Sequence, residues 1–386
     1  MPRLLLLICC LAFISLGLPD TLLGVAWPSV RNSFELKQSD ISWLLFGSGC
    51  SYLLSSFFAG RLLKSFNLGV LLAASSGLVA LSAFDYSFAK AWQLFALGSL
   101  LHGLGSGAID SGLNHYAATH FSARHMNWMH ACYGVGAMLG PLVMTAAIVG
   151  LNSWRAGYWI VAALLVCLST LFLSTKRHWN SGPAHASDAH PHETVSAGAA
   201  LKNRTLQLHL LLFFVYTGLE VAIGQWSFTV LTEARKISPE AAGAWVTIYW
   251  SGILAGRVGL GFIADRVSID ALIRASMLVA ALGAALFAWN PAPLAAPVAL
   301  ALCGLGLAVI FPCLMTRTPQ RLGKALSAHA IGFQVGAAML GAAALPSLAG
   351  WMAHAAGLAV VPLIFPSVAL LLLVLHEFVL ARKEVQ

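Results

Sequence analysis

Four ionisable residues stand inside segments that are otherwise apolar. Asp20, Asp110 and Glu220 are carboxylic acids, and Arg257 carries a guanidinium. A charge in a hydrocarbon environment is costly unless it is neutralised by a proton, paired, or open to water. We therefore interpret the three acids as candidate proton-coupling residues. Arg257 is long enough to reach a membrane surface, and we expect it to form a structural gate or ion pair near the inner ends of two spans.

The neighbours of these acids are suited to binding a polar solute. Asn114 follows Asp110 by four residues, so the two side chains share one helix face. A carboxylate beside an amide can bind a sugar hydroxyl or hold a transferable proton, and a flat indole suits the face of a sugar ring. The predicted solute-binding residues are Asp110, Asn114, Glu220, Gln225, Trp27, Trp226 and His130.

Each of these residues also has a purely structural interpretation. Asp20 follows Pro19, and its carboxylate would then satisfy the backbone at a proline kink. Asp110 would form a polar lock between helices, with His130 as its partner. The tryptophans and His130 would be packing residues. Three glycines precede Asp110, and they predict a close helix contact beside it.

The composition indicates the class of protein that these residues belong to. Of 386 residues, 59% are hydrophobic and 9% are charged, and mean hydropathy is +0.81. Soluble domains are about half apolar and about a quarter charged. The values exclude a soluble enzyme, a disordered protein and a disulfide scaffold. The formal net charge of +8 is spread among loops and reflects membrane topology, so no nucleic-acid partner is expected.

The apolar stretches predict an all-α membrane protein with twelve transmembrane helices. A span needs about 20 apolar residues. The predicted spans are 4–30, 41–63, 68–89, 91–118, 127–150, 154–176, 205–232, 240–263, 268–289, 294–315, 325–349 and 356–381. Polar residues 177–204 separate them into an N-terminal bundle (1–176) and a C-terminal bundle (205–386), joined by a cytoplasmic linker. Lys and Arg are concentrated on one side, which places both termini in the cytoplasm.

The two bundles are predicted to be related by an internal repeat. Matching elements occur in the same order in both halves, as expected for a pseudo-symmetric six-plus-six arrangement. They are Asp20 with Gly24 and Glu220 with Gly224; Gly60 with Lys64 and Gly261 with Asp265; Gly103-Leu-Gly105 and Gly304-Leu-Gly306; and His130 with Gly136 and His329 with Gly336.

This organisation resembles the major facilitator superfamily. After the eighth span the chain reads Gly261-Phe-Ile-Ala-Asp265-Arg266, which matches the family's Gly-x-x-x-Asp-Arg loop signature, whereas Gly60-Arg61-Leu-Leu-Lys64 departs from it. The resemblance implies the major facilitator fold, with spans one, four, seven and ten around a central cavity. Asp265 and Arg266 are predicted, together with Arg257, to be structural or gating residues.

A narrower resemblance lies in spans four, five and seven. The stretch from Gly103 to Asn114, followed by Met129-His130, is similar to the fucose-permease-like branch, which includes sodium-dependent glucose transporters. Tyr216-x-Gly218-x-Glu220 fits the same branch. In fucose permeases an acid in span one and another in span four serve proton coupling and sugar recognition. The matching positions here are Asp20 and Asp110.

We therefore expect a monomeric secondary transporter in the inner membrane that moves a small polar solute, a sugar, by proton-coupled symport with alternating access. Sodium is the alternative coupling ion. A proton-driven exporter of drugs or metabolites is the alternative function, and a transporter-like receptor that carries nothing is a second. No Walker loop, nucleophile elbow or zinc-spaced His/Cys set occurs, so neither an enzyme, a metal site nor a cofactor is predicted.

Overall fold

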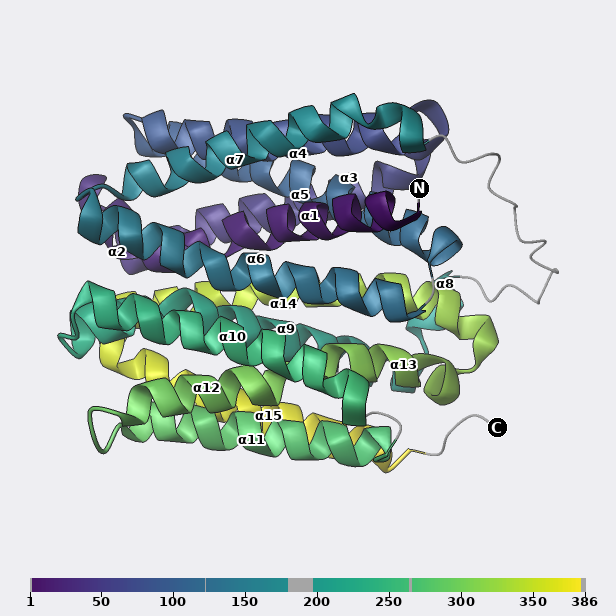
Figure 1. Ribbon diagram of the computed structural model, residues 1–386. Coiled ribbons are helices and arrows are strands. Elements are labelled where there is room, and N and C mark those ends of the chain that lie inside the picture. Colours follow the sequence, from purple (N-terminus) through teal and green to yellow (C-terminus); the bar gives the residue numbers. More distant parts are fainter. Residues whose placement is uncertain (1, 122, 180–196, 264–265, 383–386) are drawn as a thin grey trace. The chain divides into compact units, whose positions relative to one another are not determined.

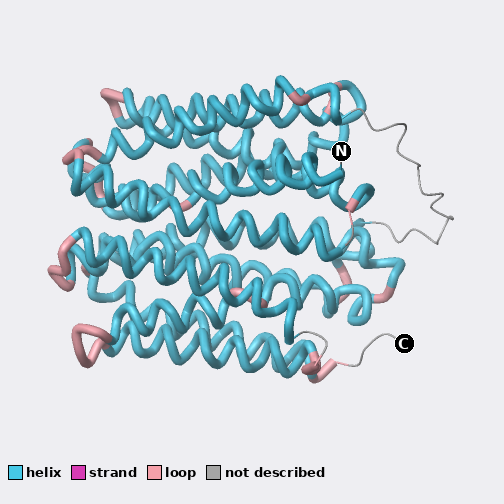
Figure 2. Tube along the Cα trace, viewed as in Figure 1, coloured by secondary structure: helices cyan, strands magenta, loops and turns pink. Residues whose placement is uncertain are grey.

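The structure is a computed structural model, and it describes residues 2–121, 123–179, 197–263 and 266–382. Throughout these residues the chain is helical or forms loops and turns (Figure 2). The first half contains α1 (Pro2–Asp20), α2 (Leu22–Ser33), η1 (Gln38–Asp40), α3 (Ile41–Ser65), α4 (Leu68–Phe88), α5 (Trp92–His120), α6 (Ala123–Gly150), α7 (Trp154–Ser174) and η2 (Lys176–Trp179).

The second half repeats this pattern of long helices. It contains α8 (Ala197–Leu201), α9 (Arg204–Thr229), η3 (Val230–Ala234), α10 (Pro239–Ile263), α11 (Ile269–Trp289), α12 (Ala295–Leu307), α13 (Ile310–Leu322), α14 (Lys324–Ala356), η4 (Leu358–Val360) and α15 (Val361–Leu380). Within the described ranges, ten helical segments are long and apolar enough to cross a membrane. Helices α5 and α10 have 29 and 25 residues, which is also long enough.

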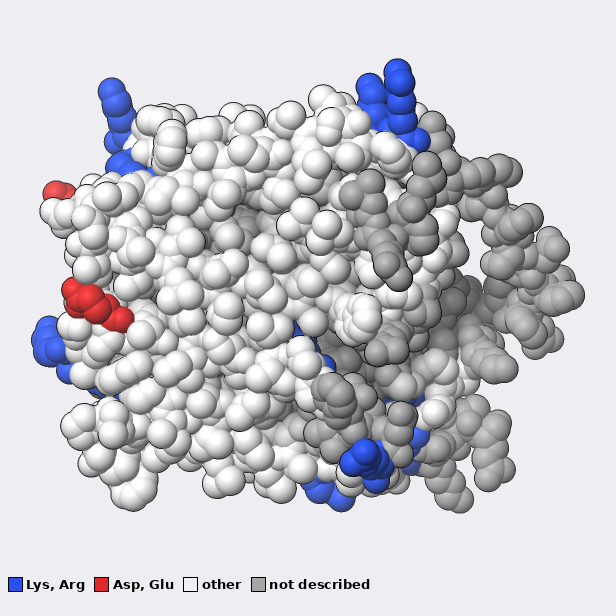
Figure 3. Space-filling view, in the orientation of Figure 1, with Lys and Arg blue, Asp and Glu red and all other residues white. Residues whose placement is uncertain are grey.

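The surfaces of these helices are those of a membrane protein. Trp43, Phe57 and Leu282 are exposed to 71%, 75% and 66%, which an aqueous surface would not favour over so many helices. On the face drawn in Figure 3, charged side chains gather mainly toward the helix ends, and uncharged residues fill the wide region between them. The predicted all-α membrane fold is confirmed.

The chain divides into two compact units. Unit 1 comprises Met1–Ala184 with Ser227–Thr247, and unit 2 comprises His185–Trp226 with Ile248–Gln386. In unit 1, α3 packs on α5, α4 contacts both α5 and α7, and α1 runs along α6 (Figure 1). In unit 2, α11 packs on α12 and α15, and α13 contacts α14. The bundle boundaries at 176 and 205 stay a prediction.

The segment Ser227–Thr247 belongs to unit 1 although it lies far along the sequence. Its Glu233 pairs with Arg31 at 2.8 Å and accepts a hydrogen bond of 3.1 Å from Gln38. A Cβ added at Gly243 would lie 2.0 Å from the hydroxyl of Thr145, so that contact is close. The sequence patterns did not predict that Ser227–Thr247 belongs to unit 1.

Two of the spans are interrupted. The first breaks at Thr21, between α1 and α2, where Pro19 precedes the last residue of α1. Thr21 Oγ1 donates to the carbonyl of Ala137 at 3.0 Å, so α6 supports the break. The tenth span breaks at Ala308 and Val309, between α12 and α13. Interrupted helices are common at the binding sites of transporters.

Candidate functional site

The first polar cluster surrounds Asp20 in unit 1. Its Oδ1 lies 2.9 Å from Nε2 of His102, on α5, and its Oδ2 accepts a hydrogen bond of 3.0 Å from the hydroxyl of Tyr133, on α6. The side chains of Asp20 and His102 are exposed to 30% and 15%. Asp20 thus lies at the end of α1 with both carboxylate oxygens engaged by other helices.

Close packing of α1 on α6 holds this cluster in place. A Cβ on Gly17 would lie 2.2 Å from the carbonyl oxygen of Tyr133, and one on Gly136 would lie 2.2 Å from that of Ile14. Only residues without a side chain allow two helix backbones to approach this closely. The glycines therefore fix Asp20 beside Tyr133.

The second cluster surrounds Asp110, on α5. Its carboxylate accepts hydrogen bonds from Tyr52 Oη at 2.7 Å and from Asn114 Nδ2 at 2.9 Å. The Asp110–Asn114 contact predicted from their spacing is confirmed. So is the close contact predicted from the glycines, because a Cβ on Gly103 would lie 2.1 Å from the carbonyl oxygen of Ser48. Both donors that the described residues supply to Asp110 are neutral.

The third cluster surrounds Glu220, on α9 of unit 2, where the side chain is buried. Arg257 Nη2 lies 3.6 Å from Glu220 Oε1. Tyr216 donates a hydrogen bond to Oε2 of the same carboxylate. The hydroxyl of Tyr249 donates to the backbone carbonyl of Glu220 at 2.8 Å. This carboxylate therefore has a cationic partner, unlike Asp110.

Arg257 forms an ion pair, and its partner is Glu220. Its expected place near the inner ends of spans two and eight stays a prediction. Arg266 is exposed, and Asp265 lies outside the described residues. The proposed gating roles of these two residues stay predictions.

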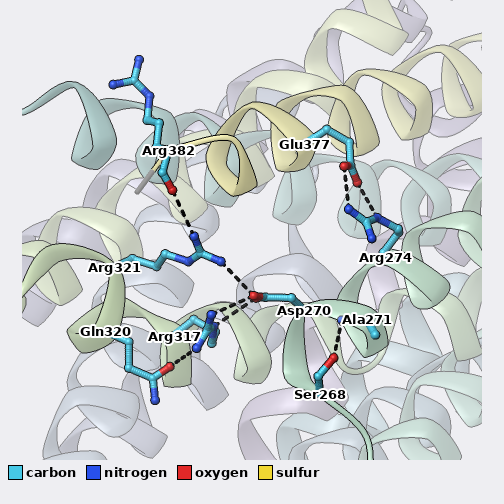
Figure 4. A network of polar contacts seen from close by, with 9 residues as sticks. All are labelled: Ser268, Asp270, Ala271, Arg274, Arg317, Gln320, Arg321, Glu377 and Arg382. Atoms are coloured by element: carbon cyan, nitrogen blue, oxygen red, sulfur yellow. Dashed lines mark hydrogen bonds and ion pairs between the residues drawn. The ribbon is translucent and has the colours of Figure 1, made fainter. Parts of the chain in front are cut away.

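Other charged residues form the ionic network at one end of unit 2. Asp270, at the start of α11, accepts hydrogen bonds from Arg317 Nη2 at 2.7 Å and Arg321 Nη2 at 2.8 Å (Figure 4). Nearby, Arg274 and Glu377 join α11 to α15 through two hydrogen bonds of 2.7 Å. No pattern in the sequence distinguishes these residues, since charges near loops are common in membrane proteins.

The two tryptophans predicted to stack on a solute are fully buried in this structure. Trp27 donates its indole N–H to Gln38 Oε1 at 2.9 Å, and Trp226 donates to the carbonyl of Pro346 at 2.8 Å. Neither ring face is open to a solute in this conformation. Gln225 is also buried, and its Nε2 has no hydrogen-bond acceptor among the described residues.

His130 lies apart from the hydrogen bonds of Asp110. Its ring packs on Phe13 with ring centroids 5.0 Å apart, whereas Asp110 is held by Tyr52 and Asn114. The hydrogen bonds that the described residues give to Asp110 come from Tyr52 and Asn114, and the suggested lock to His130 stays a prediction. Sequence reasoning missed His102, Tyr52 and Tyr133. One signal existed for His102, which precedes Asp110 by eight residues, close to two helical turns each of about 3.6 residues.

The fold and these clusters define a polytopic helical membrane protein with ionisable groups held inside its spans, as in secondary carriers. The sequence matches the family model described as Major Facilitator Superfamily over residues 9–334 and again over 208–386. The chain belongs to this superfamily. It is a membrane transporter and not an enzyme, in agreement with the sequence prediction.

Named relatives cover most of the chain. It is 25% identical over 358 residues to the glucose/mannose transporter GlcP of Bacillus subtilis (strain 168), spanning 88% of this chain and 85% of that protein. It is 24% identical over 384 residues to human sodium-dependent glucose transporter 1, spanning 88% and 72%. The branch suggested by the sequence motifs is supported by these matches.

Solved structures share the fold. The nucleoside transporter NupG aligns with a TM-score of 0.77 at 15% identity, covering 98% of this chain and 100% of that one. The transporter FucP in its outward conformation aligns with a TM-score of 0.64 at 17% identity, covering 97% and 98%.

Proposed function

We propose that this protein is a secondary active transporter that moves a sugar together with protons, by alternating access. Relatives that are 24% and 25% identical along most of the chain are named as glucose transporters, which supports a hexose as solute. No nucleotide-binding loop occurs in the sequence, so uphill transport would draw on an ion gradient.

The environment of Asp110 carries the proposal that the ion is a proton. A carboxylate held only by neutral donors in a low-dielectric setting gains most from neutralisation by a proton. Tyr52 and Asn114 are such donors. Glu220 was also predicted to couple protons, but its ion pair with Arg257 favours a carboxylate that stays charged. We assign coupling to Asp20 and Asp110, and solute binding to Glu220.

Each unit supplies its own solute-binding groups in this proposal. In unit 1, Asp110 and Asn114 offer an acceptor and a donor to sugar hydroxyls. In unit 2, Glu220 and Gln225 do the same, and the buried amide nitrogen of Gln225 is available as a donor. Polar groups that are satisfied only when solute is bound give selectivity against analogues lacking the hydroxyl.

The test is uptake of D-glucose and D-mannose by the purified full chain in proteoliposomes. A proton gradient of one pH unit corresponds to about 1.4 kcal/mol, which supports about tenfold accumulation for one proton per sugar. We expect accumulation when the interior is alkaline. Asp110→Asn is expected to abolish accumulation while exchange of labelled for unlabelled sugar persists, because the amide preserves the hydrogen-bonding shape.

The controls separate the alternatives. A sodium gradient at equal pH tests the ion suggested by the names of the human and other relatives. The drug-exporter alternative predicts a different result. Lipophilic cations would leave the vesicles when the exterior is acidic, and no sugar would accumulate. Equal uphill uptake by Asp110→Asn and wild type would contradict the role assigned to Asp110.

The setting of the protein is part of the proposal. We propose a monomer in the inner membrane with both termini cytoplasmic, on the basis of the Lys and Arg distribution. Alkaline phosphatase and green fluorescent protein fused in turn to the C-terminus would report its side of the membrane. Phosphatase activity from the C-terminal fusion would contradict the proposed orientation.

A further inference from the structure

The contact between His102 and Asp20 carries an inference that extends the proposed function and rests on it. The His102 ring nitrogen is 2.9 Å from one oxygen of Asp20, and Tyr133 donates to the other at 3.0 Å. Asp20 is the last residue before the break in the first span. An imidazole and a carboxylate are in direct contact here, inside a membrane span. The pair carries one negative charge when the ring is neutral and no net charge when the ring is protonated.

We propose that His102 and Asp20 form a single proton-binding site in which the coupling proton resides on the imidazole of His102. A free carboxyl group takes up a proton near pH ~4, whereas imidazole does so near pH ~6.5. With the ring neutral, the pair carries the charge of Asp20. In the neutral ring Nε2–H donates to the carboxylate. A proton taken from water at the other ring nitrogen, Nδ1, converts the pair to imidazolium and carboxylate, whose net charge is zero, and its release to water restores the negative charge.

The transport cycle requires the His102–Asp20 pair to have no net charge when it is closed off from water. Moving an uncompensated charge out of contact with water is costly in a membrane span. The protonated His102–Asp20 pair would be the form in which unit 1 is closed to water. Tyr133 is a positioning residue, because its hydroxyl holds Asp20 while the close packing at Gly17 and Gly136 fixes the two helices.

The titratable groups on the helices packed against the pair have other positions or partners. From α4, Asp85 lies against Gly98, one helical turn along α5 from His102. From α7, Arg155 donates to the backbone carbonyl of Ser87. From α6, His130 packs on Phe13. Tyr133 of α6 contacts Asp20 directly.

The remaining neighbours link this site to Asp110. Tyr52, on α3, donates a hydrogen bond to Asp110 at 2.7 Å. Asp110 lies on α5, the helix that also carries His102. Unit 1 would hold two proton sites along α5.

The first test follows the proton directly and needs no sugar. Histidine labelled with ¹⁵N in the full chain gives ring signals that report protonation, and the signal lost in His102→Gln identifies His102. We expect this ring to gain a proton between about pH 8 and about pH 5. In Asp20→Asn the ring should take up its proton only at a lower pH than in wild type, because the carboxylate that stabilises the imidazolium is gone. His354→Gln, at an exposed histidine of α14, is the matched control.

The outcomes of this test are distinct. A His102 ring that stays neutral throughout the range, or one that titrates identically in Asp20→Asn, overturns the inference. An unchanged spectrum for the remaining rings in His102→Gln shows that the variant is folded, and Tyr133→Phe should retain a titrating His102 with a shifted midpoint.

The second test separates this inference from the proposed function. In proteoliposomes, His102→Gln should accumulate D-glucose about tenfold less than wild type, and its pH profile of exchange should differ from that of wild type. Wild-type accumulation matched by His102→Gln, with the same pH profile, overturns the inference and leaves the symporter standing. If wild type moves no proton with any sugar tested, the proposed function fails, and the ring titration alone decides whether this pair binds a proton.

Discussion

Arg257 lies 3.6 Å from Glu220 in unit 2, whereas Asp110 in unit 1 is held by the neutral groups of Tyr52 and Asn114. Three acids of the same type in the sequence therefore have different electrostatic surroundings. Glu220 is compensated by a cation of the protein, Asp20 contacts the ring of His102 and the hydroxyl of Tyr133, and Asp110 is held by dipoles. This difference is the basis for the distinct roles proposed above for residues that the sequence presented as equivalent.

Removing Arg257 is expected to destabilise the protein strongly. Arg257→Gln leaves the buried carboxylate of Glu220 without its cation, and breaking such a pair costs about 3 kcal/mol. Thermal unfolding of the detergent-purified protein should show this loss, and Glu220→Gln added to Arg257→Gln should restore part of it. Arg274→Gln removes an exposed pair with Glu377 and should change little. Equal effects of the two arginine variants would contradict a special role for Arg257.

The Asp270 network predicts a second stability effect. Asp270→Asn removes the charge shared by Arg317 and Arg321 (Figure 4) and leaves two cations close together. With Arg321 buried, the expected loss of unfolding free energy is about 2 kcal/mol. Adding Arg317→Gln should relieve the repulsion and recover stability. Glu240→Gln, at the exposed start of α10, is the control, and no recovery in the double variant would show that repulsion is not the cause.

Trp27 and Trp226 are predicted to stabilise the folded protein and not to bind the solute. Trp226→Phe removes the hydrogen bond to Pro346 and leaves a buried carbonyl without its donor, which costs about 1 to 3 kcal/mol. Trp27→Phe does the same to Gln38. The apparent KM for sugar should stay within about twofold of wild type. Loss of a contact with bound sugar would instead raise this KM. A raised KM with unchanged thermal stability would instead favour the stacking role expected from the sequence.

A glycine pair of the internal repeat offers a matched steric test. Gly136→Ala puts a Cβ about 2.2 Å from the carbonyl oxygen of Ile14 and should cost about 1 to 3 kcal/mol by overpacking. Its repeat partner, Gly336, has nothing within 4 Å of such a Cβ in the described part of the chain. Gly336→Ala is therefore expected to be neutral or slightly stabilising. Similar losses in both variants would mean that helix contact is not the reason for Gly136.

The repeat also shows where sequence reasoning ends. Val135-Gly136-Ala137 and Val335-Gly336-Ala337 are the same letters, yet one glycine is crowded and the other is open. Identical local sequences indicate that both segments are helices. Which residues of other helices each glycine contacts depends on the tertiary packing. Spacing within one helix, such as Asp110 with Asn114, was predicted correctly for the opposite reason, because helix geometry alone determines it.

Contacts between distant helices could not be predicted in this way. Apolar length identified the spans, and Pro19 marked the break in the first of them. His102 reaches Asp20 across 82 residues of sequence, and Tyr52 reaches Asp110 across 58. A tyrosine in an apolar helix carries no signal of its own, since its ring suits packing and its hydroxyl finds a partner only once the helices are assembled.

The placement of Ser227–Thr247 in unit 1 has a consequence for how the protein is made. A polypeptide cut within the linker at 177–204 yields a second fragment that still contains the partner of Arg31 and Gln38. The first fragment alone would lack part of its own compact unit. We expect the two fragments to be degraded when produced separately and to survive when produced together, so that biogenesis of the first half waits for synthesis to pass residue 247.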